Sequence, residues 1–217
     1  DSSEYARLRN SLHGLGACRI YRNESRLGVL ANKIAVLQDA TLPWALLFDS
    51  DNTLHASLLD GFVGLEEADE DVVYCPEKAC PHFDFSRWSG GVLGLAEIAE
   101  ILRGPDRRLC RVLLNTGNHF LPVRRFLALL HPYCNADVEA ADAMFYMSGW
   151  LRDGGRIQIL RDTEYRHRIH AQSAFLDSKG KSKRIIHALS DALATGSQEC
   201  VGESLDRIAG ARPKVAS

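Results

Sequence analysis

The stretch Pro43–Ser57, PWALLFDSDNTLHAS, is an apolar run that ends in two aspartates, Asp49 and Asp51, separated by one residue. The segment WALLF is apolar on both faces, which is typical of a central strand in an α/β sheet. Ligands of open α/β sheets bind beyond the carboxyl ends of the strands. Asp and Asn also favour turns and helix caps. Two aspartates and Asn52 at one strand end nevertheless favour a functional site.

Length, composition and charge limit the classes of protein. With 217 residues and 46% hydrophobic content, the chain can bury one sizeable core, so we expect a single domain over residues 1–217. A net charge of −2 indicates no nucleic-acid or membrane partner. No apolar run approaches the roughly 18 residues of a membrane span. The chain begins without Met, so a targeting peptide or an earlier strand could precede residue 1, and the compartment stays open.

The six cysteines are scattered along a chain that is too long to need disulfide stapling, so we expect them to be mostly free. Cys75, Cys80 and His82 in CPEKACPH could supply three zinc ligands. No partner pair follows at the spacing of a zinc finger. We therefore assign no structural zinc.

Apolar periodicity predicts alternating helices and strands. Helices are expected at residues 3–15 and 29–37, in LLDGFVGL, LGLAEIAEIL and LPVRRFLALL, and at residues 183–194. Strands are expected in ACRIY, WALLF, VVYC, LCRVLLNTG and RIQIL. The acidic stretch EEADED is expected to be a solvated loop. This order predicts an α/β fold with a mixed, mostly parallel central sheet flanked by helices.

Two enzyme classes place an aspartate pair after a strand. LLFDSDNTL resembles the first motif of the haloacid dehalogenase-like phosphatases, in which Asp49 would attack phosphorus and Asp51 would protonate the leaving group, with Mg²⁺ screening the charges. Thr116 in VLLNTGN and Lys181 in KGKSKRIIHAL resemble the next motifs. CVGESLDRIAGAR resembles the last motif, but Glu203 stands where that motif has Asp.

The second class, the GT-A glycosyltransferases, uses the aspartates to hold Mn²⁺ or Mg²⁺, which neutralises the diphosphate of a nucleotide sugar as it leaves. Such a domain begins with strands and helices that alternate as in a Rossmann fold, and its acidic pair comes some way into the chain. Residues 1–51 have this order.

Six segments resemble, in the same order, the glycosyltransferase domain of the procollagen lysyl hydroxylase and collagen glycosyltransferase group. They are SEYARLRNSLHGLGACRIYR, ANKIAVLQDA, LLFDSDNTLHASLLDGF, VVYCPEKACPH, RWSGGVLGLAEIAEILR, and DAMFYMSGWLRDGG with IQILRDTEYRHRIHAQSAF. The resemblance implies a single GT-A-like domain, in which residues 104–138 are a candidate insertion.

The resemblance also implies a metal site. Asp49 and Asp51 would hold Mn²⁺ or Mg²⁺, and His187 falls near the family's late metal-binding histidine. Imidazole beside two carboxylates suits Mn²⁺. The family's acidic pair is one residue wider, and His187 stands in a helical pattern instead of a Gly-rich loop.

The donor and catalytic residues follow in the same way. Lys33 matches a lysine on the family's second helix, and Ser89, Gly90 and Gly91 match a turn that approaches the donor closely, because glycine tolerates positive φ and has no side chain. Asp142, which opens a helix, would orient the donor sugar or act on the acceptor hydroxyl. Two neighbours depart from the family, which has asparagine where Trp88 stands and glutamine where Ala143 stands.

By this resemblance the protein would move glucose or galactose from a UDP-sugar donor to an acceptor hydroxyl, by analogy that of a protein hydroxylysine. The family context would place it in the lumen of the endoplasmic reticulum or Golgi; otherwise it would be intracellular. Two alternatives stay open: the phosphatase, and a catalytically inactive relative that acts as a scaffold in a larger chain or assembly.

Overall fold

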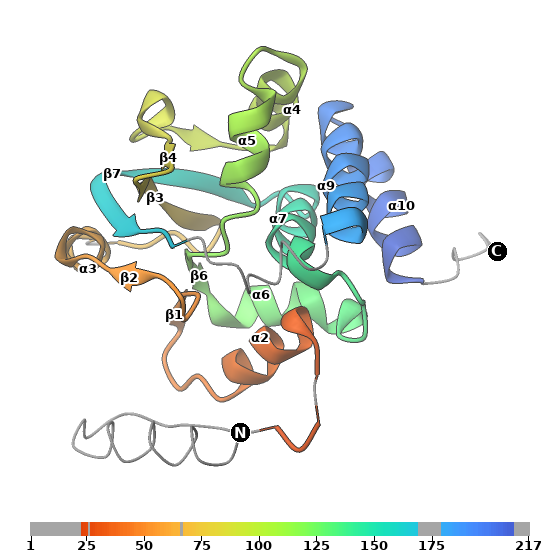
Figure 1. Cartoon of the computed structure of the whole chain (residues 1–217), viewed down its shortest axis with the longest axis horizontal. Coiled ribbons are helices and arrows are strands. Elements are labelled where there is room, and N and C mark those ends of the chain that lie inside the picture. Colours follow the sequence, from red (N-terminus) through yellow and green to blue (C-terminus); the bar gives the residue numbers. More distant parts are fainter. Residues whose placement is uncertain (1–22, 26, 66, 169–178, 211–217) are drawn as a thin grey trace.

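A computed structural model describes residues 23–25, 27–65, 67–168 and 179–210 of the protein (Figure 1). The helix expected at residues 3–15 and the strand ACRIY lie outside these residues. The described chain is an α/β structure with one mixed sheet flanked by helices, in agreement with the expected fold class.

The sheet contains seven described strands. They are β1 (Trp44–Leu47), β2 (Thr53–Leu54), β3 (Val72–Cys80), β4 (Phe83–Asp84), β5 (Val92–Leu93), β6 (His119–Pro122) and β7 (Arg156–Arg166). The main order is β1-β6-β3-β7-β2, with β4 paired to β3 and β5 paired to β7. Only the β3–β7 pair is parallel among these strands. The prediction of a mostly parallel sheet is therefore wrong.

The segment 104–138 explains part of the difference between the predicted mostly parallel sheet and the observed sheet. It supplies β6, which lies between β1 and β3 and runs antiparallel to both. This candidate insertion is therefore part of the sheet. WALLF, expected to be central, lies at one end of the order of the described strands, where only Leu47 of β1 is buried.

The described helices surround the sheet. They are α2 (Val29–Gln38), α3 (Ala56–Val63), α4 (Leu95–Arg103), α5 (Arg107–Leu113), α6 (Val123–Leu130), α7 (Asp142–Arg152), α9 (Lys179–Ala194) and α10 (Gln198–Ala209). Short 3₁₀ turns η1 (Ser86–Trp88), η2 (His131–Tyr133) and η3 (Glu139–Ala141) join them. The helices predicted at α2, α3, α4, α6 and α9 are confirmed. No described helix is long and apolar enough to cross a membrane.

The prediction of a strand in LCRVLLNTG is wrong. This segment begins inside α5, where Cys110, Leu113 and Leu114 recur at three- and four-residue spacing and are buried together. Arg111, on another face of the helix, extends to Ser190 of α9. A short apolar run fits a buried helix face as well as a strand, and tertiary packing selected the helix here.

Helix α7 lies in the middle of the molecule, between the sheet and the pair α9–α10 (Figure 1). All its residues from Asp142 to Leu151 are buried. Gly149 faces Leu129 of α6, and a Cβ there would make an ordinary contact with Leu129 at 3.5 Å. Full burial of a large apolar side chain such as Phe145 contributes about 1.5–3 kcal/mol. This helix anchors the core and fixes the position of its first residue, Asp142.

The opposite face of the sheet carries a smaller aromatic cluster around Phe120. Trp44 stacks on Phe120 at 5.1 Å between ring centroids, and Phe62 of α3 stacks on it at 4.6 Å. Tyr74 of β3 completes the group at 6.3 Å from Phe120. The cluster ties α3, β1, β3 and β6 together, which holds the β1 end of the sheet in place.

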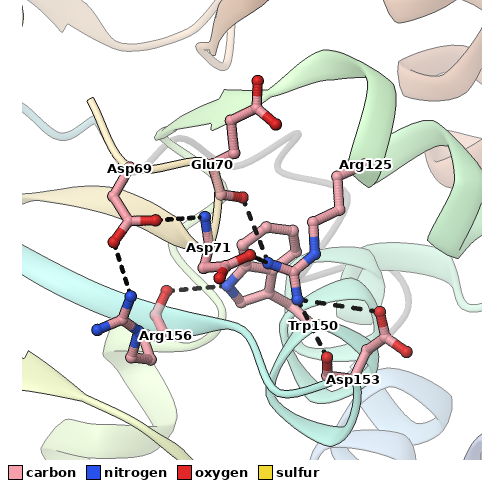
Figure 2. Close-up of polar contacts among 7 residues, drawn as sticks. All are labelled: Asp69, Glu70, Asp71, Arg125, Trp150, Asp153 and Arg156. Atoms are coloured by element: carbon pink, nitrogen blue, oxygen red, sulfur yellow. Dashed lines mark hydrogen bonds and ion pairs between the residues drawn. The ribbon is translucent and has the colours of Figure 1, made fainter. Parts of the chain in front are cut away.

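The acidic loop EEADED is less free than expected. Asp71 pairs with Arg125 of α6, and Arg156 Nη2 lies 2.7 Å from Asp69 Oδ2 (Figure 2). The Arg125 guanidinium also lies 4.4 Å from the ring of Trp150, whose Nε1 donates to the Arg156 carbonyl at 2.8 Å. We call this group the loop cluster. It fastens the loop to the amino end of β7 and the carboxyl end of α7.

Candidate functional site

Three predicted site residues meet in the fold, although they come from distant parts of the chain. Lys33 Nζ, from α2, lies 2.8 Å from Asp142 Oδ2 and 3.3 Å from Asp49 Oδ1. The exposed fractions of the side chains are 14% for Lys33, 8% for Asp142 and 40% for Asp49. We call this group the lysine–aspartate cluster. It has a buried end at Asp142 and a solvent-facing end at Asp49.

Local structure holds each member in place. Helix α2 buries Leu30, Ile34 and Leu37 and packs against α6 and η3, which leads directly into Asp142. The backbone N–H of Asp49 donates to Asn118 Oδ1 at 2.9 Å. Asn118 directly precedes β6, the strand that pairs with β1. The cluster therefore depends on the pairing of β1 with β6.

Gly117 lies against the cluster. It has a φ of 77°, which favours glycine. A Cβ at this position would lie 3.0 Å from Asp49 Oδ2 and 3.2 Å from Lys33 Nζ. We did not predict this role; the polar turn NTGN after an apolar run was the only indication of it. Gly117 lets the backbone approach the charged groups closely.

A buried polar pair lies beside Lys33. His119 Nδ1 and the Tyr146 hydroxyl are 2.7 Å apart, and Lys33 Nζ lies 5.9 Å from the centroid of the Tyr146 ring. Burial, reinforced by the charge of Lys33, lowers the pKa of His119 to about 3. Burial, together with the charges of Asp142 and Asp49, raises the pKa of Tyr146 well above its ordinary value. Both groups are therefore uncharged near neutral pH.

The charges of the cluster influence one another. Burial alone lowers the pKa of Lys33, but the attraction of Asp142 and Asp49 outweighs it and leaves the pKa raised. Burial raises the pKa of the Asp49 carboxyl; Lys33 opposes this rise, and the charges of Asp142 and Asp51 add to it. The ammonium therefore stays protonated, and Asp49 is the carboxyl whose ionisation the site disfavours.

Asp51 is half-buried and precedes β2, which pairs with the carboxyl end of β7. The Asn52 side chain accepts a hydrogen bond from Arg168 N at 3.1 Å, just beyond β7. Burial and the neighbouring His82 lower the pKa of His167, whereas the charges of Asp51 and Asp49 raise it. These contacts bring the acidic pair close to the end of β7, a relation that the sequence does not show.

His187, the predicted third metal ligand, is exposed on α9, which packs against α4, α7 and α10. Within the described part of the chain, no group of three or more His, Cys, Asp or Glu side chains is arranged to hold a metal ion. The structure therefore does not bring Asp49, Asp51 and His187 together as one set of ligands.

The predicted donor turn Ser89–Gly91 lies against the middle of β7. Gly90 N donates to the Ile159 carbonyl at 2.7 Å, and Ile159 N donates to the Gly91 carbonyl at 3.3 Å. Gly90 has a φ of 70°, and a Cβ there would lie 2.3 Å from Arg161 Nε. The glycines thus allow a close approach of Arg161 to the turn.

Buried Glu77 organises this turn from β3. Its carboxylate accepts hydrogen bonds from the Ser89 hydroxyl and from Asp162 N, the latter at 3.1 Å. The β3–β7 register shifts between Pro76 and Lys78, where three residues of β7, Arg161–Thr163, face Glu77 alone, so the extra residues lie in β7 and Asp162 N points to the Glu77 carboxylate. The turn thus belongs to a network with β3 and β7, whereas Lys33 belongs to the lysine–aspartate cluster.

In the phosphatase alternative, the segment VLLNTGN adjoins Asp49 through Gly117 and Asn118, whereas the predicted side chains have other partners. The Thr116 hydroxyl donates to the Leu113 carbonyl at 3.2 Å, as in a helix-terminal turn. Lys181 Nζ lies 2.6 Å from Asp137 and 3.6 Å from Glu139. In the acidic last motif, Asp206 accepts a hydrogen bond from the Tyr133 hydroxyl. The cation beside Asp49 is therefore Lys33, which has no counterpart in that alternative.

The cysteines of the described chain, Cys75, Cys80, Cys110, Cys134 and Cys200, are free, as expected. Cys75 is fully buried, and burial raises the pKa of its thiol. Cys80 Sγ donates to Glu164 Oε2 at 3.4 Å. Cys75, Cys80 and His82 do not form a three-ligand metal group.

Comparisons with protein-family models, with curated proteins and with solved structures gave no match for this chain.

Proposed function

We propose that the protein is a GT-A-like glycosyltransferase that moves glucose or galactose from a UDP-sugar to an acceptor hydroxyl. The observation that supports this most strongly is the convergence of Lys33, Asp49 and Asp142. These residues lie in three separate segments that resemble the collagen glycosyltransferase group. Of the phosphatase motifs, VLLNTGN adjoins Asp49 through Gly117 and Asn118, but Lys181 pairs with Asp137 and Asp206 bonds to Tyr133.

The charge of the site favours a cation-assisted reaction. Asp49 and Asp142 carry two carboxylates, when both are ionised, beside the single ammonium of Lys33. Such a site repels an anionic diphosphate unless a further cation binds. Mg²⁺ is commonly held by one or two carboxylates together with substrate phosphates, so Asp49 and Asp51 fit this role without a third protein ligand. When bound, Mn²⁺ or Mg²⁺ would neutralise the diphosphate leaving group.

Asp142 is the proposed catalytic residue. It is buried at the first turn of α7, where the helix dipole favours negative charge, and Lys33 pairs with it. Its carboxylate would accept a hydrogen bond from a hydroxyl of the donor sugar or from the attacking acceptor hydroxyl. Lys33 would act as a positioning residue that holds the Asp142 carboxyl group in place.

Ser89–Gly91 and the acceptor complete the proposal. The turn would let the donor come close to the backbone, because Gly90 and Gly91 have no side chains, although its N–H groups already donate within the protein. The resemblance suggests a protein hydroxylysine as the acceptor. A UDP-sugar hydrolysis assay without acceptor tests the donor half of the reaction independently.

Thermal unfolding with nucleotides tests the proposal. UDP with Mn²⁺ should raise the Tm, because a ligand at a hundred times its Kd stabilises the native state by about 2.7 kcal/mol. ADP and GDP with Mn²⁺ serve as nucleotide controls. The absence of a shift with UDP, UDP-glucose and UDP-galactose would count decisively against a nucleotide-sugar site.

Variants then identify the site. Asp49→Asn combined with Asp51→Asn should abolish the Mn²⁺-dependent part of the UDP shift, whereas Lys181→Met, on α9, should leave it intact. Asp142→Asn should retain UDP binding but lose transfer. Full transfer by Asp142→Asn would remove Asp142 from the catalytic role. A phosphatase would instead show beryllofluoride bound at Asp49 with Mg²⁺.

A further inference from the structure

Two histidines meet just beyond the ends of the central parallel strands. His82 follows β3, His167 follows β7, and their Nδ1 atoms are 3.3 Å apart. The rings are nearly perpendicular, with an interplanar angle of 89°. His82 is exposed and His167 is half-buried, so solvent reaches the pair. Neither residue belongs to the proposed glycosyltransferase site.

The sheet positions this pair. Cys80 is in register with Arg166 in the parallel β3–β7 ladder, and His167 N donates to the Cys80 carbonyl at 2.8 Å. The ring of Phe83 lies 5.5 Å from the His167 ring. Backbone pairing and ring packing thus hold the two imidazoles together, although the residues are far apart in sequence.

The distance between the nitrogens matches metal coordination. Two imidazole nitrogens bonded at about 2.0–2.1 Å to one tetrahedral Zn²⁺ are separated by about 3.3–3.4 Å. A direct hydrogen bond between neutral rings is usually shorter, at about 2.7–3.2 Å. We propose that His82 and His167 form a two-imidazole site for a divalent transition-metal ion of the Zn²⁺ type, whose other positions are open to water or an added ligand.

The chemistry separates this site from the proposed Mn²⁺ site. Imidazole nitrogen suits Zn²⁺, Cu²⁺ and Ni²⁺, whereas carboxylate oxygen suits Mg²⁺ and Mn²⁺. Asp51 and Asp49 act electrostatically on His167, and their negative charge would attract a cation to the pair. With two protein ligands, the site would bind metal more weakly than a closed structural zinc site does. The inference goes beyond the proposed transferase activity and does not depend on it.

Calorimetric titration of the metal-free full chain with ZnCl₂ tests the proposal. One Zn²⁺ per chain should bind, and His82→Asn or His167→Asn should weaken binding by about tenfold or more. His187→Asn, a change at an exposed histidine on α9, is the matched control and should leave binding unchanged. Asp49→Asn should preserve the binding stoichiometry, which separates this site from the proposed transferase site. Unchanged Zn²⁺ affinity in both histidine variants would overturn the inference.

Substitution with Co²⁺ distinguishes nitrogen from sulfur ligands. Visible d–d bands without a thiolate charge-transfer band are expected; a strong thiolate band would show that cysteines bind the ion and would overturn the proposal. If the variants do not fold, imidazole ¹H–¹⁵N spectra of the unaltered chain supply the test. Zn²⁺ should shift two histidine side chains, and shifts confined to other histidines would refute the assignment.

Discussion

The lysine–aspartate cluster and the loop cluster use similar chemistry in opposite surroundings. Lys33 and Asp142 are almost enclosed by protein, whereas side chains of the loop cluster are 48% exposed at Asp69 and 62% exposed at Asp71. Water can replace a lost partner in the loop cluster. In the buried cluster an unpaired charge has no comparable solvation.

This contrast in exposure changes what the loss of one partner should cost in each cluster. Exposed ion pairs contribute about 0–1 kcal/mol each, so the loop cluster gains strength only through its combination of contacts (Figure 2). A buried ion pair gives little net stabilisation because desolvation offsets the attraction, yet losing one partner is costly. The buried pair of Lys33 and Asp142 therefore adds little net stability, although the loss of either partner should be costly.

The largest expected effect is that of Lys33→Met. It leaves Asp142 unpaired in a buried place and should lower the free energy of unfolding by about 3–5 kcal/mol. Urea denaturation measures this change. Lys181→Met, at a lysine that is 38% exposed, is the control and should cost less than about 1 kcal/mol. Equal losses in the two variants would remove the distinction between buried and exposed pairs.

The next effect is a pH dependence at His119. Its folded pKa of about 3 lies below the ordinary 6.5, so between these values the unfolded chain binds a proton that the folded chain does not. Stability from this group is therefore present above pH 6.5 and is lost as the pH falls, by at most about 1.4 kcal/mol per pH unit. His119→Gln should show a shallower loss in urea titrations at decreasing pH, and His187→Gln should follow the unaltered chain. An equally steep loss in His119→Gln would show that other groups cause it.

Arg125→Ala tests the strongest member of the loop cluster. It removes the ion pair with Asp71, the contact over the Trp150 ring and a 3.0 Å hydrogen bond to the Asp153 carbonyl. We expect a loss of about 1–2 kcal/mol in the free energy of unfolding. Thermal and urea unfolding measure it. A loss as large as that of Lys33→Met would mean that the loop cluster is the main electrostatic support of the fold.

The smallest effect is expected for Asp71→Asn. This side chain faces solvent and Arg125 keeps its other contacts, so the change should cost about 0–1 kcal/mol and should decrease further at high salt. Urea midpoints at low and high ionic strength check this. A large, salt-independent loss would show that Asp71 has a structural role beyond its ion pair.

Strong periodicity predicted most helices correctly, because the apolar faces of α2, α4 and α9 are buried where the spacing places them. Short apolar runs were less informative. LCRVLLNTG begins in a helix, and WALLF lies at an end of the described strand order. Both depended on contacts with distant segments, which local patterns do not contain.

In the candidate site, too, the sequence indicated some residues, and other contacts are seen only in the structure. Asp49 was found from its own segment, and Lys33 and Asp142 were found only through a resemblance of short motifs. The contact of Gly117 with Asp49 and the pairing of His82 with His167 could not be predicted, since each joins two segments far apart in the chain. His187 satisfied a motif position but lies exposed on α9.

The sequence by itself determined the α/β class, most helices and the presence of an acidic pair after a strand, because these follow from local periodicity and residue chemistry. Only the tertiary structure decided the strand order, the antiparallel insertion of β6 and the neighbours of Asp49. The physical reason is that burial and ion pairing depend on which segments meet. The pKa of the buried Lys33 is raised because the fold brings the carboxylates of Asp142 and Asp49 next to it.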